Sequence, residues 1–436
     1  MARRGWQRGG VLLALVLTTL FFGSAAAEAA ELKFGGYAKL DLIFRRYQQN
    51  QDLADPGSVP IRGNDPTRFT EFRMHARQTR LNLTLTEKVG PTNLRGFVEG
   101  DFFGVTGTQT VSNSDSFRLR HAFGEVTLPT GTTVLAGQTW SSLMTTPALF
   151  DVVDFNGPTG SVFVRQAQLR VTQKLTPNWA AVFAVENPEF FIPSAVVLPS
   201  GATRGATAGS GTGAGGATSS TVADIAPDLV GKLVWIHPRW GTVEARGLLR
   251  FLRAKTPVSG DSDTGVTGAG GLAGRLNVWK SGEGQEIALL FESLVGTGVG
   301  RYTLAVGPDA IIKANGDVEG VLGATGTAGF EYQATKQLKY HAVLGGEYFQ
   351  SKKDTANGIG FGLPTRDAAS TIGNPGTGGG NQRSLSVHAG AWYKFFDRYR
   401  VGLEYIWMQR RIFGLAASGD NQGDNHSVQA AVQFFF

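Results

Sequence analysis

The chain has 436 residues, no cysteine, 60 glycines and a formal net charge of +6, and only 17% of its residues are charged. The small net charge argues against a nucleic-acid partner, and the lack of cysteine excludes disulfide bonds. After the first 27 residues, no apolar run reaches the length of about 18 residues that a transmembrane helix needs. The glycine content is roughly twice the usual share of about 7%, which suits a twisted β-sheet.

Met1–Ala27 has the layout of an export signal. Three arginines lie among its first eight residues, Val11–Phe22 is an apolar run too short to span a bilayer, and Ala25–Ala27 offers a small-residue cleavage site. This segment holds three of the 41 Lys and Arg and none of the 35 Asp and Glu, so the remaining chain carries a net charge of only +3. We expect the signal to be cleaved and residues 28–436 to form a single domain.

The first segment after the signal alternates between apolar and polar residues, with the period of two that is typical of a β-strand. In Leu32–Tyr47, Phe34 and Leu40 belong to one face, while Lys39 and Asp41 belong to the other. A charged face buried between two packed sheets would be costly, whereas the same face costs little where it lines water. The pattern therefore predicts a strand with a wet side and a lipid side.

The same alternation recurs along the chain and predicts sixteen strands. The predicted strands are Leu32–Tyr47, Gln78–Thr86, Asn93–Phe103, Phe117–Thr127, Thr132–Trp140, Val162–Thr172, Asn178–Asn187, Leu229–Ile236, Thr242–Arg253, Gly271–Val278, Glu286–Leu294, Val318–Gln333, Leu338–Gln350, Arg383–Tyr393, Tyr399–Gln409 and His426–Phe436. In the fourth strand the alternation slips near His121, which indicates a β-bulge. Short turns and long loops alternate strictly between the strands, as they do between the periplasmic and extracellular ends of outer-membrane barrels.

The last strand, His426–Phe436, ends on three phenylalanines. A free chain end normally lies in water, but the last strand of a membrane barrel pairs with the first, and its aromatic residues lie at the membrane interface. An edge strand of a soluble β-sandwich is the alternative interpretation. The predicted fold is all-β, a 16-stranded antiparallel transmembrane β-barrel of the bacterial outer membrane. Aromatic residues near strand ends, including Trp140 and Trp392, are expected in its interfacial belts.

The third long loop, Ser141–Gly160, is very apolar for an exposed segment, and such a cluster should be covered. Folding into the barrel lumen would cover it, constrict the pore and place Asp151 and Asp154 near the opening. The alternative is a loop that packs over the barrel mouth or against a neighbouring subunit.

Arginines recur on the presumed lumen faces of the strands. The guanidinium group matches carboxylate and phosphate groups in geometry, so a row of arginines facing the acidic loop would favour anions. For any single arginine, the alternative is a structural wall charge that pairs with a carboxylate such as Glu99 or Asp101. The lumen arginines are Arg80, Arg95, Arg118, Arg120, Arg170, Arg246, Arg250 and Arg275.

Several short segments carry a resemblance to a known family. They are Gly36–Asp41, Arg77–Arg80, Glu99–Phe103, Arg118–Glu125, Leu135–Ser141 and Arg165–Arg170. These segments resemble the DcaP-like family of trimeric outer-membrane porins over roughly residues 34–190. The resemblance implies a homotrimer that takes up small organic anions such as dicarboxylates. It also implies that the pore is lined by Arg80, Arg118, Arg120, Arg165 and Arg170.

These features predict a porin that gives small, preferentially carboxylate-type anions passive diffusion through an arginine-lined constriction. Its expected surroundings are the lipid bilayer and lipopolysaccharide, and no cofactor or metal is implied. None of the six histidines lies in a His-Glu-x-x-His pattern or beside a Gly-x-Ser-x-Gly elbow, so enzymatic activity is not predicted. The alternative is a structural or adhesive barrel with a plugged lumen, which binds a partner through its loops, among them Pro188–Asp228.

Overall fold

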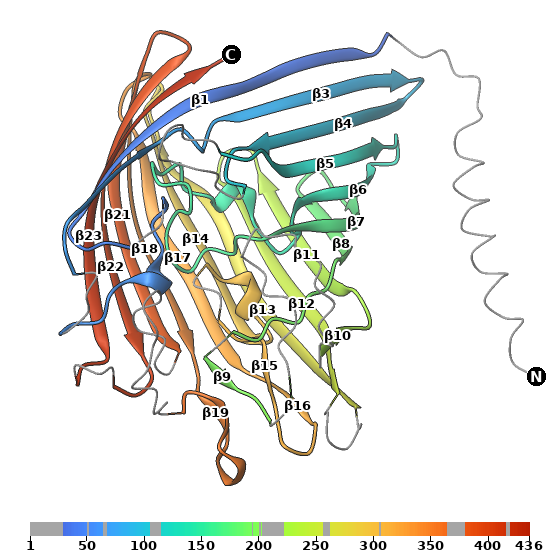
Figure 1. Ribbon diagram of the computed structural model, residues 1–436. Helices are drawn as coiled ribbons and strands as arrows, with labels where there is room; N and C mark the ends of the chain where they lie inside the picture. The colour runs from blue at the N-terminus through green and yellow to red at the C-terminus, as the bar shows by residue number, and fades with distance from the viewer. Residues whose placement is uncertain are drawn as a thin grey trace, which may run out of the picture.

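A closed ring of antiparallel strands forms the body of the molecule in the computed structural model (Figure 1). The structure describes residues 29–49, 52–63, 68–104, 115–193, 195–199, 202, 222–255, 262–304, 307–363, 380–415 and 419–436. The expected export signal, Met1–Ala27, and most of the fourth long loop lie outside these residues.

The wall consists of sixteen strands, two of which are interrupted. β2 and β3 both pair with β1 and together make the second wall strand, and β10 and β11 both pair with β12 in the same manner. The elements of the wall are β1 (Glu31–Arg45), β2 (Glu71–His75), β3 (Arg80–Val89), β4 (Thr92–Asp101), β5 (Arg118–Thr127), β6 (Thr132–Trp140), β7 (Arg165–Lys174), β8 (Trp179–Glu186), β10 (Val222–Asp224), β11 (Asp228–His237), β12 (Gly241–Lys255), β13 (Ser262–Lys280), β14 (Glu286–Thr297), β17 (Leu322–Gln333), β18 (Leu338–Phe349), β21 (Asn381–Phe395), β22 (Tyr399–Ile412) and β23 (Gln422–Phe435).

The ring closes between the first and the last strand, as the sequence predicts. β23 pairs with β1 from Tyr37↔Phe435 to Arg45↔Ser427, and the rings of Phe34 and Phe436 stack across this seam at 5.6 Å. The short turns and the C-terminus lie at one end of the barrel, and the long connections lie at the other (Figure 1). The predicted sixteen-stranded barrel, with its alternation of short and long connections, is therefore confirmed.

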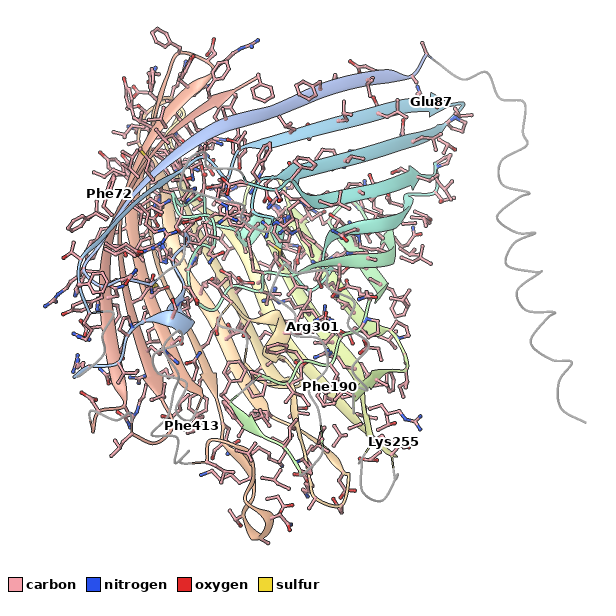
Figure 2. The ribbon with its side chains drawn as sticks, viewed as in Figure 1. Phe72, Glu87, Phe190, Lys255, Arg301 and Phe413 are labelled. Carbon is pink, nitrogen blue, oxygen red and sulfur yellow. The ribbon has the colours of Figure 1, made fainter. Side chains whose placement is uncertain are left out.

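The two faces of the wall differ as the alternating pattern predicts. Phe34 and Phe72 are 62% and 61% exposed on the outside, whereas Lys39 and Asp41 are 3% and 0% exposed on the inside. Figure 2 shows Phe72 pointing away from the wall. An outer surface of this kind is unfavourable in water and suits the hydrocarbon core of a bilayer.

Several wall strands depart from the prediction at their ends. The second strand starts at Glu71 rather than Gln78, because the second half of β1 pairs with β2, for example Leu42 with Met74. The segment 318–320, predicted as part of a wall strand, leaves the wall and pairs as β16 with β15. β13 begins at Ser262, inside a predicted loop, because it pairs with β12 over the whole length of that strand.

The β-bulge expected near His121 is confirmed. The pairing of β4 with β5 passes from Glu99↔His121 to Gly100↔Leu119 and therefore skips Arg120. An extra residue in a strand breaks the alternation between its two faces. For this reason the consecutive residues Arg120 and His121 are both buried. The bulge thus brings the side chain of Arg120 to the inside of the barrel.

An apolar core, called the inner core below, fills the lumen beside β8, β11, β12, β14 and β18. Its other residues come from the connections β6–β7 (loop 3), β8–β10 (loop 4), β14–β17 (loop 6) and β18–β21 (loop 7). The inner core consists of Leu143, Met144, Val162, Ala184, Phe190, Ile192, Val196, Val230, Leu248, Leu252, Ala254, Leu294, Val299, Tyr302, Ala310, Ile311, Ile312, Val318, Val321, Phe349 and Phe361. Burial of these side chains fixes the loops inside the ring.

Short elements lie within the connections. They are β9 (Val196–Val197), β15 (Ala310–Ile312), β16 (Val318–Gly320), β19 (Lys352–Asp354), β20 (Ile359–Phe361) and the single turns η1 (Pro56–Ser58), η2 (Thr146–Ala148), η3 (Gly300–Tyr302) and η4 (Thr355–Asn357). β9, β19 and β20 form a small sheet that joins loop 4 to loop 7. Within the described ranges, no helix has the length and apolar character to cross a membrane.

Candidate functional site

Glutamates of six wall strands hold loop 3, residues 141–164, against the inside of the wall. Their carboxylates accept hydrogen bonds from amide or hydroxyl groups of the loop, for example at 2.6 Å from Ser142 N and 2.8 Å from Asp151 N. The six are Glu186 (β8), Glu244 (β12), Glu292 (β14), Glu331 (β17), Glu347 (β18) and Glu404 (β22). The prediction that the third long loop folds into the lumen is confirmed, and the loop covers the acidic part of the wall.

The tip of loop 3 is held most closely by Glu404. Its carboxylate accepts hydrogen bonds from Val153 N at 2.7 Å and Asp154 N at 2.8 Å, and its other oxygen lies 2.7 Å from His388 Nδ1. The indole of Trp392 donates to Asp151 O at 2.9 Å. Charge-assisted bonds to backbone amides are strong, so these contacts fix how far the loop projects into the lumen.

Replacing Glu404 by alanine should therefore release the tip of loop 3. The amides of Val153 and Asp154 would lose their acceptor, and each buried unsatisfied amide costs about 1–3 kcal/mol. We expect a larger and noisier single-channel conductance in planar bilayers. Glu283→Ala, in an exposed turn, is the matched control. A folded Glu404→Ala barrel with the conductance of the control would contradict the role of this carboxylate.

A cavity of about 520 Å³ lies between loop 3 and the wall strands β1, β3–β6 and β21–β23. Aromatic rings and charged groups alternate on its surface. The charged groups that border it are the cations of Lys39, Arg80, Arg95, Arg120 and Arg400 and the carboxylates of Glu99, Asp151 and Asp154. Cations therefore outnumber carboxylates on this surface by five to three.

As far as the structure describes the chain, two of these arginines have no carboxylate partner within hydrogen-bond distance. Arg80 has its nearest carboxylate, Glu99, at 3.9 Å, and its Nε has no hydrogen-bond partner among the described residues. The guanidinium of Arg95 lies 5.3 Å and 5.4 Å from the ring centres of Phe97 and Phe123, and within the described chain no carboxylate forms an ion pair with it. Aromatic faces attract a guanidinium without cancelling its charge, so both groups can attract an anion.

The other three cations of the cavity are paired. Arg120 donates to Glu99 at 2.7 Å and to Asp101 at 3.0 Å. Lys39 lies 2.9 Å from the carboxylate of Asp41. Arg400 lies 2.9 Å from Asp151 of loop 3, which also pairs with Lys339.

The predicted pore arginines of β5 and β7 lie at different distances from the cavity. Arg118 forms a two-pronged ion pair with Asp101, at 2.9 and 2.8 Å, beside the cavity rather than on it. Arg165 lies over the ring of Trp140 at 4.8 Å, and Trp140 lines the cavity. Arg170 pairs across the sheet with Leu135 and lies outside the cavity lining. The structure thus gathers Arg80 and Arg120 at the cavity itself and Arg165 behind it.

Arg246 and Arg250, also predicted to line the pore, lie outside the cavity lining. Their side chains are 4% and 0% exposed, which leaves no surface for a passing solute. Arg246 donates to Leu143 O at 2.6 Å and pairs with Glu292 at 3.0 Å, so it anchors the base of loop 3. Arg246 and Arg250 therefore match the alternative interpretation, in which an arginine of the wall is a structural charge paired with a carboxylate.

The two loop aspartates also differ from each other. The side chain of Asp151 is 34% exposed and borders the cavity, as predicted. Asp154 is only 2% exposed and accepts hydrogen bonds from Ala54 N at 3.0 Å and Asn156 N at 2.9 Å. Burial raises the pKa of Asp154, and its contacts tie loop 3 to the connection between β1 and β2.

Several groups that line the cavity could not be expected from the sequence. Lys39 and Arg400 lie on polar strand faces, which the sequence shows. That both face loop 3 depends on which strands are neighbours in the closed ring, and the sequence does not show this. Trp140 and Trp392 line the cavity, so their assignment to the interfacial belts is wrong. In the part of the chain that the structure describes, no cluster of three or more His, Asp or Glu has the arrangement of a metal site.

A closed sixteen-stranded wall with its third loop folded into the lumen is the architecture of an outer-membrane porin. Among solved structures, the outer-membrane channel DcaP of Acinetobacter baumannii has the same fold, with a TM-score of 0.70, 18% identity and coverage of 94% of this chain and 98% of that one. The anion-selective porin of Comamonas acidovorans gives a TM-score of 0.52 at 9% identity, covering 94% of this chain and 100% of that one. OprB of Pseudomonas putida gives 0.51 at 9% identity, covering 98% and 97%.

The resemblance to the DcaP-like porins is thus confirmed at the level of the fold. No protein-family model matches the chain, and a search of the curated proteins finds no match.

Proposed function

We propose that the protein is a DcaP-like porin of the outer membrane, through which small, preferentially carboxylate-type anions diffuse passively. The observation that carries the proposal is the excess of cations over carboxylates on the cavity beside loop 3. Arg80 and Arg95 contribute most to this excess, since neither is fully neutralised. Selectivity in a wide barrel depends on the charges at its narrowest point.

The pairing of the wall carboxylates supports the same proposal. A porin wall that exposed as many glutamates as arginines would have little preference for either sign of charge. Here Glu186, Glu331 and Glu404 are turned toward the amides of loop 3 instead of the open lumen. The loop therefore leaves mainly cationic groups along the path of a solute.

The assembly and export of the protein are further parts of the proposal. We infer a homotrimer with lipid and lipopolysaccharide around its outer wall, and a precursor from which Met1–Ala27 is cleaved. The support is the fold shared with DcaP and the layout of the first 27 residues. Native gel migration of protein extracted from outer membranes, with N-terminal sequencing, tests both statements.

Recording in planar bilayers tests the function. In a gradient of potassium chloride, we expect the reversal potential to have the sign of a chloride preference, and succinate added to one side to block the current. A reversal potential of the opposite sign would overturn the anion preference. A purified, folded barrel that conducts no current would instead favour a structural or adhesive barrel.

A further inference from the structure

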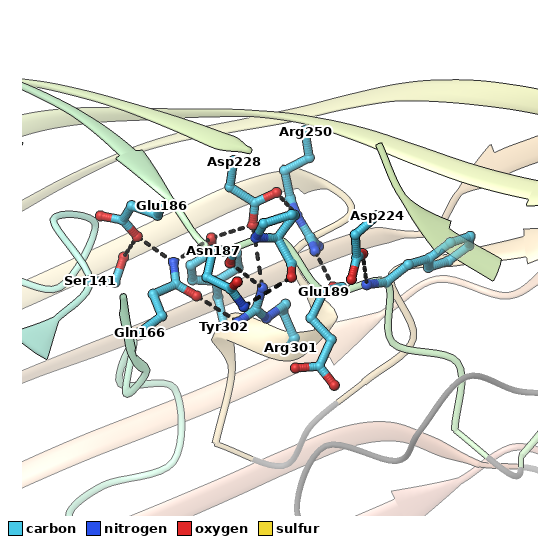
Figure 3. Close-up of polar contacts among 12 residues, drawn as sticks. Ser141, Gln166, Glu186, Asn187, Glu189, Asp224, Asp228, Arg250, Arg301 and Tyr302 are labelled. Atoms are coloured by element: carbon cyan, nitrogen blue, oxygen red, sulfur yellow. Dashed lines mark hydrogen bonds and ion pairs between the residues drawn. The ribbon is translucent and has the colours of Figure 1, made fainter. Parts of the chain in front are cut away.

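The inner core lies on the side of the lumen opposite the arginine-rich cavity. Arg250 of β12 packs over the ring of its member Tyr302 and belongs to a network of polar contacts (Figure 3). The side chain of Arg250 is 0% exposed. Its guanidinium pairs with Asp228 of β11 at 3.0 Å and with Asp309 of loop 6 at 2.8 Å. It also donates to Glu189 O of loop 4 at 2.5 Å and Gly298 O at 2.5 Å. One side chain thus joins two wall strands and two loops.

Two neighbours in loop 6 extend this network to β7 (Figure 3). The hydroxyl of Tyr302 donates to Asp228 at 2.7 Å and accepts a hydrogen bond from Gln166 at 3.3 Å. Arg301 donates to Gln166 Oε1 at 2.5 Å and to Asn187 O at 3.2 Å. Loop 6 is therefore bound to the wall by buried polar contacts as well as by apolar packing, and it blocks this side of the lumen.

The groups that face this closed side are mainly acidic. The ionisable groups around it are the carboxylates of Glu186, Asp228, Glu244, Glu292, Asp309 and Glu347 and the cations of Lys232, Arg246, Arg250 and Arg301. Carboxylates thus outnumber cations here, whereas the open cavity has the opposite balance. The barrel interior is divided into a cationic side that is open and an acidic side that is closed.

We propose that Arg250 is a positioning residue for selectivity, which keeps the acidic side of the lumen closed by holding loop 6 in place. The proposal deepens the proposed function and rests on it, because it explains why only the cationic side carries solute. Arg250 does not touch the solute itself. If Arg250 is lost and loop 6 is released, a second path opens beside the first. Asp228 of β11 borders this path without its partners Arg250, Arg301 and Tyr302, so the added current is carried by cations.

Replacing Arg250 by alanine tests the proposal in planar bilayers. We expect the single-channel conductance to rise, because a second path in parallel adds its current to that of the first. The reversal potential should shift toward that of a cation-preferring channel at the same time. A general loosening of the wall would raise conductance without this shift. The matched control is Arg253→Ala, on the same strand but exposed.

Two milder variants cover the case in which Arg250→Ala does not fold. Asp309→Asn and Tyr302→Phe keep the shapes of the side chains but each weakens one link between loop 6 and the wall. Both should shift the reversal potential in the same direction as Arg250→Ala by a smaller amount. Folded variants with wild-type conductance and wild-type reversal potential would overturn the proposal.

A thiol probe gives a second measurement that does not depend on selectivity. The chain has no cysteine, and Leu252, on β12 in the inner core, is 2% exposed. Leu252→Cys should resist a cationic methanethiosulfonate reagent in the wild-type background and react in the Tyr302→Phe background. If wild-type channels show no anion preference, the proposed function fails, but the reactivity of this thiol still decides whether loop 6 closes the acidic side.

Discussion

Replacing Arg80 and Arg95 together by glutamine is expected to lower the anion-to-cation permeability ratio about tenfold. A unit charge about 6 Å from a passing ion contributes about 0.7 kcal/mol in water, and salt at about 0.1 M reduces this to roughly 0.4 kcal/mol. The contribution has opposite signs for anions and cations, so each lost arginine changes the ratio about threefold to fourfold.

The double variant should fold normally, because neither arginine is a main partner of a buried carboxylate. Arg80 lies 3.9 Å from Glu99, whose stronger partner is Arg120 at 2.7 Å. Reversal potentials in a salt gradient measure the anion-to-cation permeability ratio. Folding is checked on a denaturing gel by the difference in mobility between heated and unheated samples. The matched control is Arg253→Gln with Lys255→Gln, which removes two exposed cations at the end of β12 where the long connections lie.

An unchanged ratio in the folded double variant would show that the selectivity filter lies elsewhere. A change as large in the control would show that the whole surface charge, rather than the cavity, sets the preference. Each single variant separates the two arginines. Arg80→Gln should act more strongly if the narrowest point lies beside Phe155 of loop 3, because Arg80 lies 5.3 Å from the centre of that ring.

The wall could be predicted from the sequence because it follows from one local rule. Alternation of Phe34 and Leu40 with Lys39 and Asp41 assigns each residue to a face, independently of any contact. The same rule fails where the chain leaves the wall. Val318 continues the alternation of the strand after it, yet it belongs to β16 inside the lumen, because β15 offers it a partner there.

The roles of individual arginines could not be predicted from that rule. Arg80, Arg246 and Arg250 all lie on inward faces, but the first borders the cavity and the other two are buried under loops. What separates them is where loops 3, 4 and 6 pack, and this depends on contacts between residues far apart in the chain, such as Arg250 with Asp309. Trp392 shows the same limit, since its indole binds Asp151 O of loop 3.

Replacing Asp101 by alanine is expected to cause a large loss of stability. Asp101 is 0% exposed and accepts hydrogen bonds from Arg118 at 2.9 and 2.8 Å, from Arg120 at 3.0 Å and from Phe103 N at 3.1 Å. Arg120 is 1% exposed, so it would keep a buried charge with Glu99 as its remaining partner. Breaking a buried ion pair costs about 3–5 kcal/mol, and because Glu99 still pairs with Arg120 we expect a loss at the lower end of this range.

Urea unfolding in detergent micelles, followed by tryptophan fluorescence, measures this loss. Asp397→Ala, in an exposed turn, is the matched control and should change stability little. Adding Arg120→Met to Asp101→Ala should restore much of the stability, since removing both partners of a buried pair is often neutral. If Asp101→Ala is as stable as the control, the pair with Glu99 is enough to hold Arg120, and the proposed role of Asp101 in stability is wrong.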